Sequence, residues 1–87
     1  MGDHSVTDRA IWDAIARNLP RTWEFYNDSG AWFGRDMATS TDDAARVAGL
    51  WLADDARWRH LDPYTTTVTV RCLVTDERAQ TTIIIEP

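Results

Sequence analysis

The feature of this sequence that most constrains the fold is an alternating stretch near the C-terminus, from Thr65 to Thr75. From Val68 on, apolar residues occupy every second position: Val68, Val70, Cys72 and Val74. The residues of the other parity are polar up to Arg71: Thr65, Thr67, Thr69 and Arg71. Because successive side chains of a strand point to opposite faces, the alternation predicts a strand with one buried and one wet face. A sheet with one wet face is typical of antiparallel architecture.

The alternating strand is expected to belong to a hairpin. Residues 76–79 suit a turn, and residues 80–86 then return as a second strand. Ile83, Ile84 and Ile85 follow one another in the returning strand. Both faces of that strand must therefore meet apolar groups.

A second hairpin is predicted where strand-forming residues at 22–27 and 31–35 flank a turn sequence at 27–30. Pairing of Tyr26 with Ala31 places three aromatic rings on the face expected to form the core: Trp23, Phe25 and Trp32. The opposite face then carries Glu24, Tyr26 and Phe33. Two aromatic rings on a solvent face need a cover or a partner.

Each hairpin is preceded by a helical pattern. Residues 8–19 carry one apolar stripe at helical spacing after the N-cap residue Thr7, and Pro20 ends the pattern. A second helix opens at Ser40, which is followed by acidic residues in the first turn. The apolar arc of this second helix consists of Ala44, Val47, Ala48, Trp51 and Trp58.

Acidic residues interrupt that arc, since Asp55 falls near its centre and Asp54 on its edge. A buried carboxylate without a partner would cost several kcal/mol. The helix is therefore either kinked near Ala53, with one of these aspartates capping a new segment, or the acids lie in a cleft. The kink is the prediction that we favour.

The order of elements is therefore α-β-β-α-β-β, in a single domain that spans residues 1–87, with a flexible N-terminus at 1–6. The predicted fold class is α+β: a four-stranded antiparallel sheet of two hairpins, with two helices packed on one face. Four tryptophans are assigned to the core: Trp12, Trp23, Trp51 and Trp58. Such large side chains suit a small domain, which buries only about 60% of the surface that its unfolded chain exposes.

Composition excludes several classes of protein. The single cysteine, Cys72, cannot form an internal disulfide, and His4 and His60 are too few for a structural zinc site. No apolar run reaches the roughly 20 residues that span a bilayer, and the N-terminus has no signal peptide, so a cytoplasmic protein without membrane contacts is expected. The sequence contains no nucleophile elbow, phosphate loop or dinucleotide motif, so we expect no enzyme activity, no cofactor and no metal.

Charge is the most informative functional feature. The chain holds 14 acidic residues, nine arginines and no lysine, and eight of the acids but only four of the arginines lie in residues 1–44. The codon bias of a GC-rich genome explains the missing lysine, although avoidance of lysine-directed chemistry is an alternative. The net charge of −5 opposes contact with phosphates. Direct nucleic-acid binding is therefore not expected, despite the aromatic and basic sequence at 57–60.

These features favour a non-enzymatic acidic protein-binding module, regulatory or inhibitory, that competes with nucleic acid for a basic partner surface. A phage or another mobile element is a fitting source for such a protein. The residues expected to bind the partner are short acidic side chains and aromatic anchors: Tyr26, Asp28, Phe33, Asp36, Asp42 and Asp43. Solubility alone also explains a net charge of this size.

Other functions remain open. A small-ligand or sugar-binding module, or a small enzyme, would use an aromatic cleft with Asp54, Asp55 and His60 as polar groups, and this alternative requires a buried Asp55. A structural subunit would work by self-association. A homodimer that covers an apolar patch or pairs an exposed edge strand is compatible with each of these functions.

Overall fold

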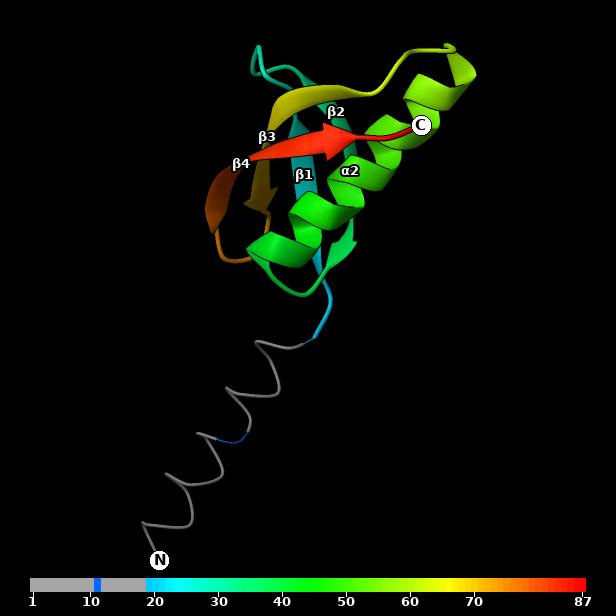
Figure 1. Ribbon diagram of the computed structural model, residues 1–87. Helices are drawn as coiled ribbons and strands as arrows, with labels where there is room; N and C mark the ends of the chain where they lie inside the picture. Colours follow the sequence, from blue (N-terminus) through cyan, green and yellow to red (C-terminus); the bar gives the residue numbers. More distant parts are fainter. Residues whose placement is uncertain (1–10, 12–18) are drawn as a thin grey trace, which may run out of the picture.

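The computed structural model describes residue 11 and residues 19–87. In the second range the elements are β1 (Arg21–Tyr26), β2 (Trp32–Ala38), α2 (Thr41–Trp58), β3 (Tyr64–Cys72) and β4 (Arg78–Ile85). The strands form one antiparallel sheet in the order β2-β1-β3-β4, and α2 covers one face of it (Figure 1). The predicted α+β class and the antiparallel sheet are confirmed. The predicted helix at 8–19, with Trp12, lies almost wholly outside the described residues.

The two hairpins form one sheet because β1 pairs with β3 as well as with β2. Trp23 lies opposite Cys72, and Phe25 lies opposite Val70. All four side chains are buried between the sheet and α2, so the alternating stretch of the sequence forms the centre of the core. Val74 is an exception to the predicted pattern: it is 73% exposed, because β3 ends at Cys72 and a turn follows.

The first hairpin pairs in a different register from the predicted one. Tyr26 lies opposite Trp32 and Phe25 opposite Gly34, so Phe33 is an extra residue in β2 and forms a β-bulge. Trp32 therefore shares the sheet face of Tyr26, away from α2, and is 55% exposed. Phe33 instead packs against Phe25, with ring centroids 5.9 Å apart. The assignment of Trp32 to the core and of Phe33 to the opposite face was wrong.

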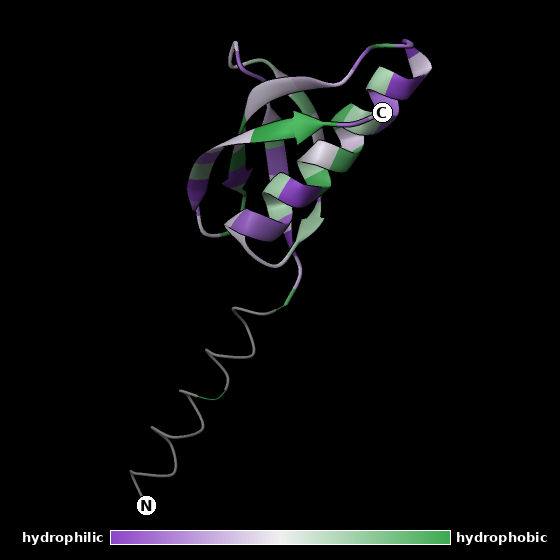
Figure 2. Cartoon of the chain, viewed as in Figure 1, coloured by the Kyte–Doolittle hydropathy of each residue, from purple (hydrophilic) through white to green (hydrophobic). Residues whose placement is uncertain are grey.

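The helix α2 is continuous over its 18 residues, so the favoured prediction of a new helical segment after Ala53 is wrong. Figure 2 shows apolar and polar residues alternating around the helix. Its buried residues are all small: Ala44, Ala45, Ala48 and Ala56. The buried side is thus rotated about the helix axis from the predicted arc, and Trp51 and Trp58 are 41% and 79% exposed. The assignment of Trp23 to the core is confirmed, because its side chain is fully buried, whereas the assignments of Trp51 and Trp58 were wrong.

Candidate functional site

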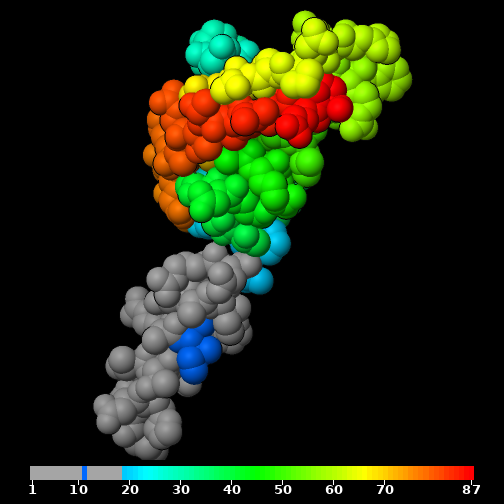
Figure 3. Space-filling model, viewed as in Figure 1, coloured from blue at the N-terminus to red at the C-terminus, as the bar shows by residue number. Residues whose placement is uncertain are grey.

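A cleft of about 670 Å³ opens between the second half of α2, the tip of the β1–β2 hairpin and the start of β3. Figure 3 shows the hairpin tip and the end of α2 projecting at the same end of the molecule. The lining combines aromatic rings with carboxylates: Asp28, Phe33, Trp51, Asp54, Asp55, Trp58 and Tyr64. Ligand sites typically have volumes of about 300–1,000 Å³, so the cleft is large enough to hold part of a partner molecule.

Trp51 forms a fixed aromatic wall of this cleft. Its ring lies directly on Gly34 of β2, where an added Cβ atom would be 2.7 Å from a ring carbon. Its indole Nε1 donates a hydrogen bond of 3.0 Å to the carboxylate of Asp36, and this bond is the largest of the causes that lower the pKa of Asp36. Its ring also makes a T-shaped contact with the ring of Phe25, at a centroid distance of 6.2 Å. Trp51 is therefore held in place although much of it remains exposed.

Trp58 is the most exposed of the large apolar residues in the described part of the chain. It is the last residue of α2, beyond Ala56, the last buried residue of the helix. A tryptophan ring that is 79% exposed gains little from the hydrophobic effect in the isolated protein. It retains most of its apolar surface for contact with another molecule.

The end of α2 is shaped by a capping motif that positions Trp58. The backbone N–H of Leu61 donates to the carbonyl of Ala56 at 2.9 Å, and that of His60 donates to the carbonyl of Arg57 at 3.2 Å. These are the bonds of a Schellman motif, in which the residue in the left-handed conformation is usually glycine. Here it is His60, with φ of 54°. His60 therefore terminates the helix and does not line the cleft.

Replacing His60 with glycine is expected to raise the free energy of unfolding by about 0.5–1 kcal/mol, because glycine adopts this conformation without the penalty of a Cβ atom. Urea denaturation of the two proteins measures the difference. The substitution His60→Ala is the control, because alanine retains the Cβ atom and also removes the imidazole. Equal stability of the glycine and alanine variants would contradict this account of the helix end.

The cleft carries more negative than positive charge. Asp55 forms an ion pair of 3.2 Å with Arg59, as the spacing of these residues in the sequence suggests. The side chain of Asp55 is 53% exposed, so the buried Asp55 required by the small-ligand alternative is not found. Asp28 and Asp54 have no ion pair among the described residues and are exposed. Unbalanced negative charge therefore lies beside the rings of Trp51 and Trp58.

The residues predicted to bind a partner do not form one surface. Asp28 and Phe33 line the cleft, and Asp36 supports its wall through Trp51. Tyr26 lies on the sheet face away from α2, where its hydroxyl donates to Glu24. Asp42 borders a different hollow at the other end of α2. The sequence prediction did not include the most exposed ring of the cleft, Trp58, among the binding residues, because it assigned that ring to the core.

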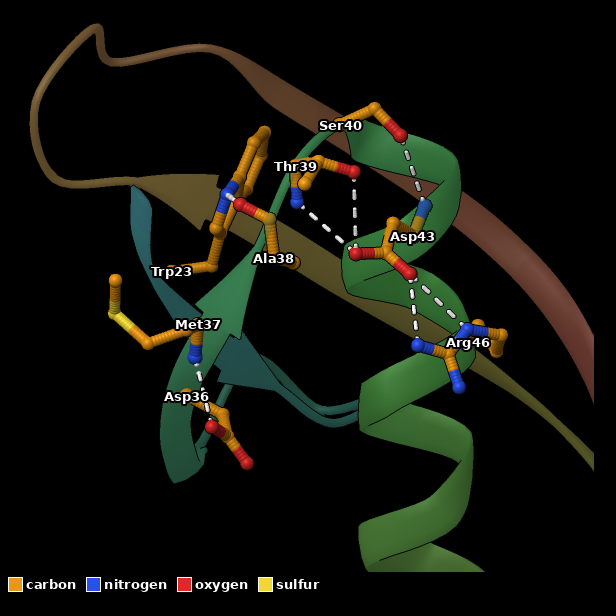
Figure 4. A network of polar contacts seen from close by, with 8 residues as sticks. All are labelled: Trp23, Asp36, Met37, Ala38, Thr39, Ser40, Asp43 and Arg46. Carbon is orange, nitrogen blue, oxygen red and sulfur yellow. Dashed lines mark hydrogen bonds and ion pairs between the residues drawn. The ribbon is translucent and has the colours of Figure 1, made fainter. Parts of the chain in front are cut away.

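Asp43 is occupied by contacts within the fold. Its carboxylate accepts hydrogen bonds from the N–H of Thr39 at 3.0 Å and from the guanidinium of Arg46 at 2.8 Å and 3.0 Å (Figure 4). Its own N–H donates to the N-cap hydroxyl of Ser40, which confirms the predicted start of the helix. The bond from Thr39, followed by that from Arg46, holds the pKa of Asp43 below its ordinary value. The spacing of four residues between Asp42 and Arg46 suggests an ion pair, but Arg46 pairs with Asp43 instead.

Replacing Asp43 with alanine is expected to lower the free energy of unfolding by about 1–2 kcal/mol, because the N–H of Thr39 loses its partner. The pKa of Asp43 is lower in the folded than in the unfolded state, so its contribution is complete above about pH 4 and is lost as the pH falls through the folded value. Urea denaturation at neutral and acidic pH should therefore show a smaller pH dependence for Asp43→Ala. The substitution Asp42→Ala, at an exposed neighbour, should change the free energy of unfolding and its pH dependence by less. Equal effects of the two substitutions would contradict the role assigned to the Asp43 carboxylate.

The start of β3 offers a free strand edge inside the cleft. β1 pairs with β3 only between Trp23–Tyr26 and Thr69–Cys72. Among the described residues, Tyr64–Val68 thus have a strand partner only on the side of β4. Tyr64, Thr65 and Thr66 line the cleft, so the unpaired part of β3 borders the same space as the rings and carboxylates.

Comparisons with known proteins give no relative: no family model, no curated protein and no solved structure matches the chain. Within the described part of the chain, no helix is both long and apolar enough to cross a membrane. The same part contains no group of three or more histidine, cysteine or acidic side chains that could hold a metal ion. The residues of the cleft are therefore the basis for any functional proposal.

Proposed function

We propose that the protein is a non-enzymatic binding module that holds a basic, extended segment of a protein partner in the cleft at the end of α2. The observation that carries the proposal is the position of Asp28 and Asp54 beside the exposed rings of Trp51 and Trp58. Arginine or lysine side chains would meet carboxylates and aromatic faces there together. A cation over an aromatic ring contributes about 0.5–1 kcal/mol at an exposed site and about 2 kcal/mol when water is excluded.

The free edge of β3 supports an extended conformation of the bound segment. A strand added beside Tyr64–Val68 would satisfy unpaired backbone groups, and this contribution to affinity does not depend on the partner's side chains. The side chains of the added strand would alternate between the two faces of the sheet. Those on the α2 side would enter the cleft, where the carboxylates favour basic residues.

A regulatory or inhibitory role is part of the proposal. A basic segment that contacts nucleic acid or another acidic partner is blocked while it occupies the cleft, so the protein would act by competition. The electrostatic part of such binding is weakened by salt, because exposed charges are screened over about 8 Å at physiological ionic strength. Origin in a phage or another mobile element is part of the same proposal, and so is action in the cytoplasm.

Fluorescence anisotropy with a labelled peptide of alternating arginine and threonine tests the proposal. We expect binding that weakens at high salt and falls at least tenfold, or about 1.4 kcal/mol, in the double variant Asp28→Asn/Asp54→Asn. The matched control is Asp42→Asn/Glu86→Gln, which changes the net charge equally but lies outside the cleft. Equal losses in the two double variants would show that only the net charge matters, and the proposal would then be abandoned.

Homodimer formation is a separate proposal. The strand that could join two copies is β4, which forms the edge of the sheet opposite to β2.

A further inference from the structure

The outer side of β4 is an unprotected sheet edge. Within the described residues this side has no strand partner. From Ala79 to Ile85 the strand contains no charged residue and no proline, and its pairing with β3 keeps one register throughout. Native proteins usually protect such edges with charges, proline or bulges. The other edge strand, β2, has the bulge at Phe33 and the charged residues Arg35 and Asp36.

We propose that β4 pairs antiparallel with β4 of a second copy of the chain, with Thr82 on the two-fold axis. In this register Arg78 of each copy lies opposite Glu86 of the other, so both ends of the pairing carry opposite charges. Moving the axis by one residue, to Thr81, would place Arg78 opposite Ile84 and lose both ion pairs. Charge complementarity therefore selects the register centred on Thr82.

An apolar groove along the same edge favours a second copy as the occupant. This hollow of about 490 Å³ lies between α2 and β4 and is lined by Leu50, Ala53, Ile83 and Ile84 among others. Leu50 and Ile84 are 58% and 70% exposed. In a continuous sheet with a two-fold axis through Thr82, both copies of α2 lie on the same face, so each can bring Leu50 toward the shared groove. Because both copies use the same edge, the assembly closes as a dimer.

A charge-exchange series tests the register. Gln80 lies opposite Ile84 of the second copy in the proposed pairing, and both residues are exposed in the single chain. The variant Gln80→Lys/Ile84→Lys places lysines opposite each other twice and is expected to be a folded monomer. The variant Gln80→Glu/Ile84→Lys places opposite charges there and is expected to be a dimer, as is the unchanged protein. Light scattering measures the molar mass, and circular dichroism confirms the fold.

A cysteine placed on the axis provides the second test. Directly opposite residues of an antiparallel pair have Cα atoms about 4.5–5.5 Å apart, within the range of about 4.4–6.8 Å that a disulfide spans. Thr82→Cys should therefore give a disulfide-linked dimer on mild oxidation. Thr69→Cys is the matched control, because Thr69 lies on the same sheet face as Thr82 but is paired on both sides, with Tyr26 of β1 and Gln80 of β4, and it should remain unlinked. A monomeric unchanged protein, an open polymer, or equal cross-linking of the two variants would overturn the proposal.

Discussion

Substitution of Gly34 by alanine is expected to lower the free energy of unfolding by about 1–3 kcal/mol, and valine should cost more, because the ring of Trp51 occupies the space of the new side chain. An added Cβ atom would lie 2.7 Å and 2.8 Å from two ring carbons, so the ring must move. Movement of the ring also breaks its hydrogen bond to Asp36. Urea denaturation measures the loss of stability, and the cleft should bind the arginine–threonine peptide less well.

The double variant Gly34→Ala/Trp51→Ala separates this contact from a general effect on β2. With the ring removed, the new methyl group has room, so Gly34→Ala should cost much less in the Trp51→Ala background than in the unchanged protein. Equal costs in the two backgrounds, or full stability of the single variant Gly34→Ala, would mean that the contact does not fix Trp51.

Substitution of Trp58 by alanine is expected to leave the free energy of unfolding within about 0.5 kcal/mol of the original value, because the ring is 79% exposed. Its effect on binding should be large. Aromatic residues that anchor an interface commonly contribute about 2 kcal/mol or more, which corresponds to about a thirtyfold loss of affinity for the arginine–threonine peptide. Anisotropy titration and urea denaturation of the same preparation measure the two quantities together.

Trp32 provides a matched control for this prediction. It is 55% exposed, but it lies with Tyr26 on the sheet face away from α2. Trp32→Ala should therefore leave the peptide affinity unchanged. If both tryptophan variants lose the same affinity, binding depends on exposed aromatic surface in general and the cleft has no special role.

The parts of the fold that the sequence predicted well depend on local chemistry. The alternation of valine with threonine defined the buried face of β3, and Ser40 with the acids that follow it marked the start of α2. The turn after β1 was also recognisable, since Asn27 accepts hydrogen bonds from the N–H groups of Ser29 and Ala31, and Gly30 has φ of 83°. Each of these features is decided by residues within a few positions of one another.

The errors arose where distant residues decide the structure. The bulge at Phe33 put Trp32 on the face away from α2 and Phe33 against Phe25, and a bulge depends on how a strand pairs rather than on its own residues. In α2, the tryptophans suggested a buried arc, but the sheet already buries the large rings of Trp23 and Phe25. Alanines therefore face those rings, and the bulkier Trp51 lies at the margin.

The cleft could be predicted only in part for the same reason. Asp54 and Asp55 were recognised as candidate cleft residues, and Asp28 as a candidate for partner binding, but their common location depends on how the hairpin tip and the end of α2 meet. The free edge at Tyr64–Val68 exists because β1 is shorter than β3, which neither strand shows by itself. Functional sites built from three separate segments are poorly marked in a single sequence.

Chemical-shift mapping of the 15N-labelled protein with the unlabelled arginine–threonine peptide tests the central claim most directly. We expect the peptide to shift the backbone amides of Tyr64–Val68 and Asp28 and the indole N–H signals of Trp51 and Trp58, and to slow amide exchange along the start of β3. Signals of Trp32 and Tyr26 should stay in place. Shifts confined to the sheet face that carries Trp32, or no shifts at peptide concentrations that saturate the anisotropy signal, would contradict binding in the cleft.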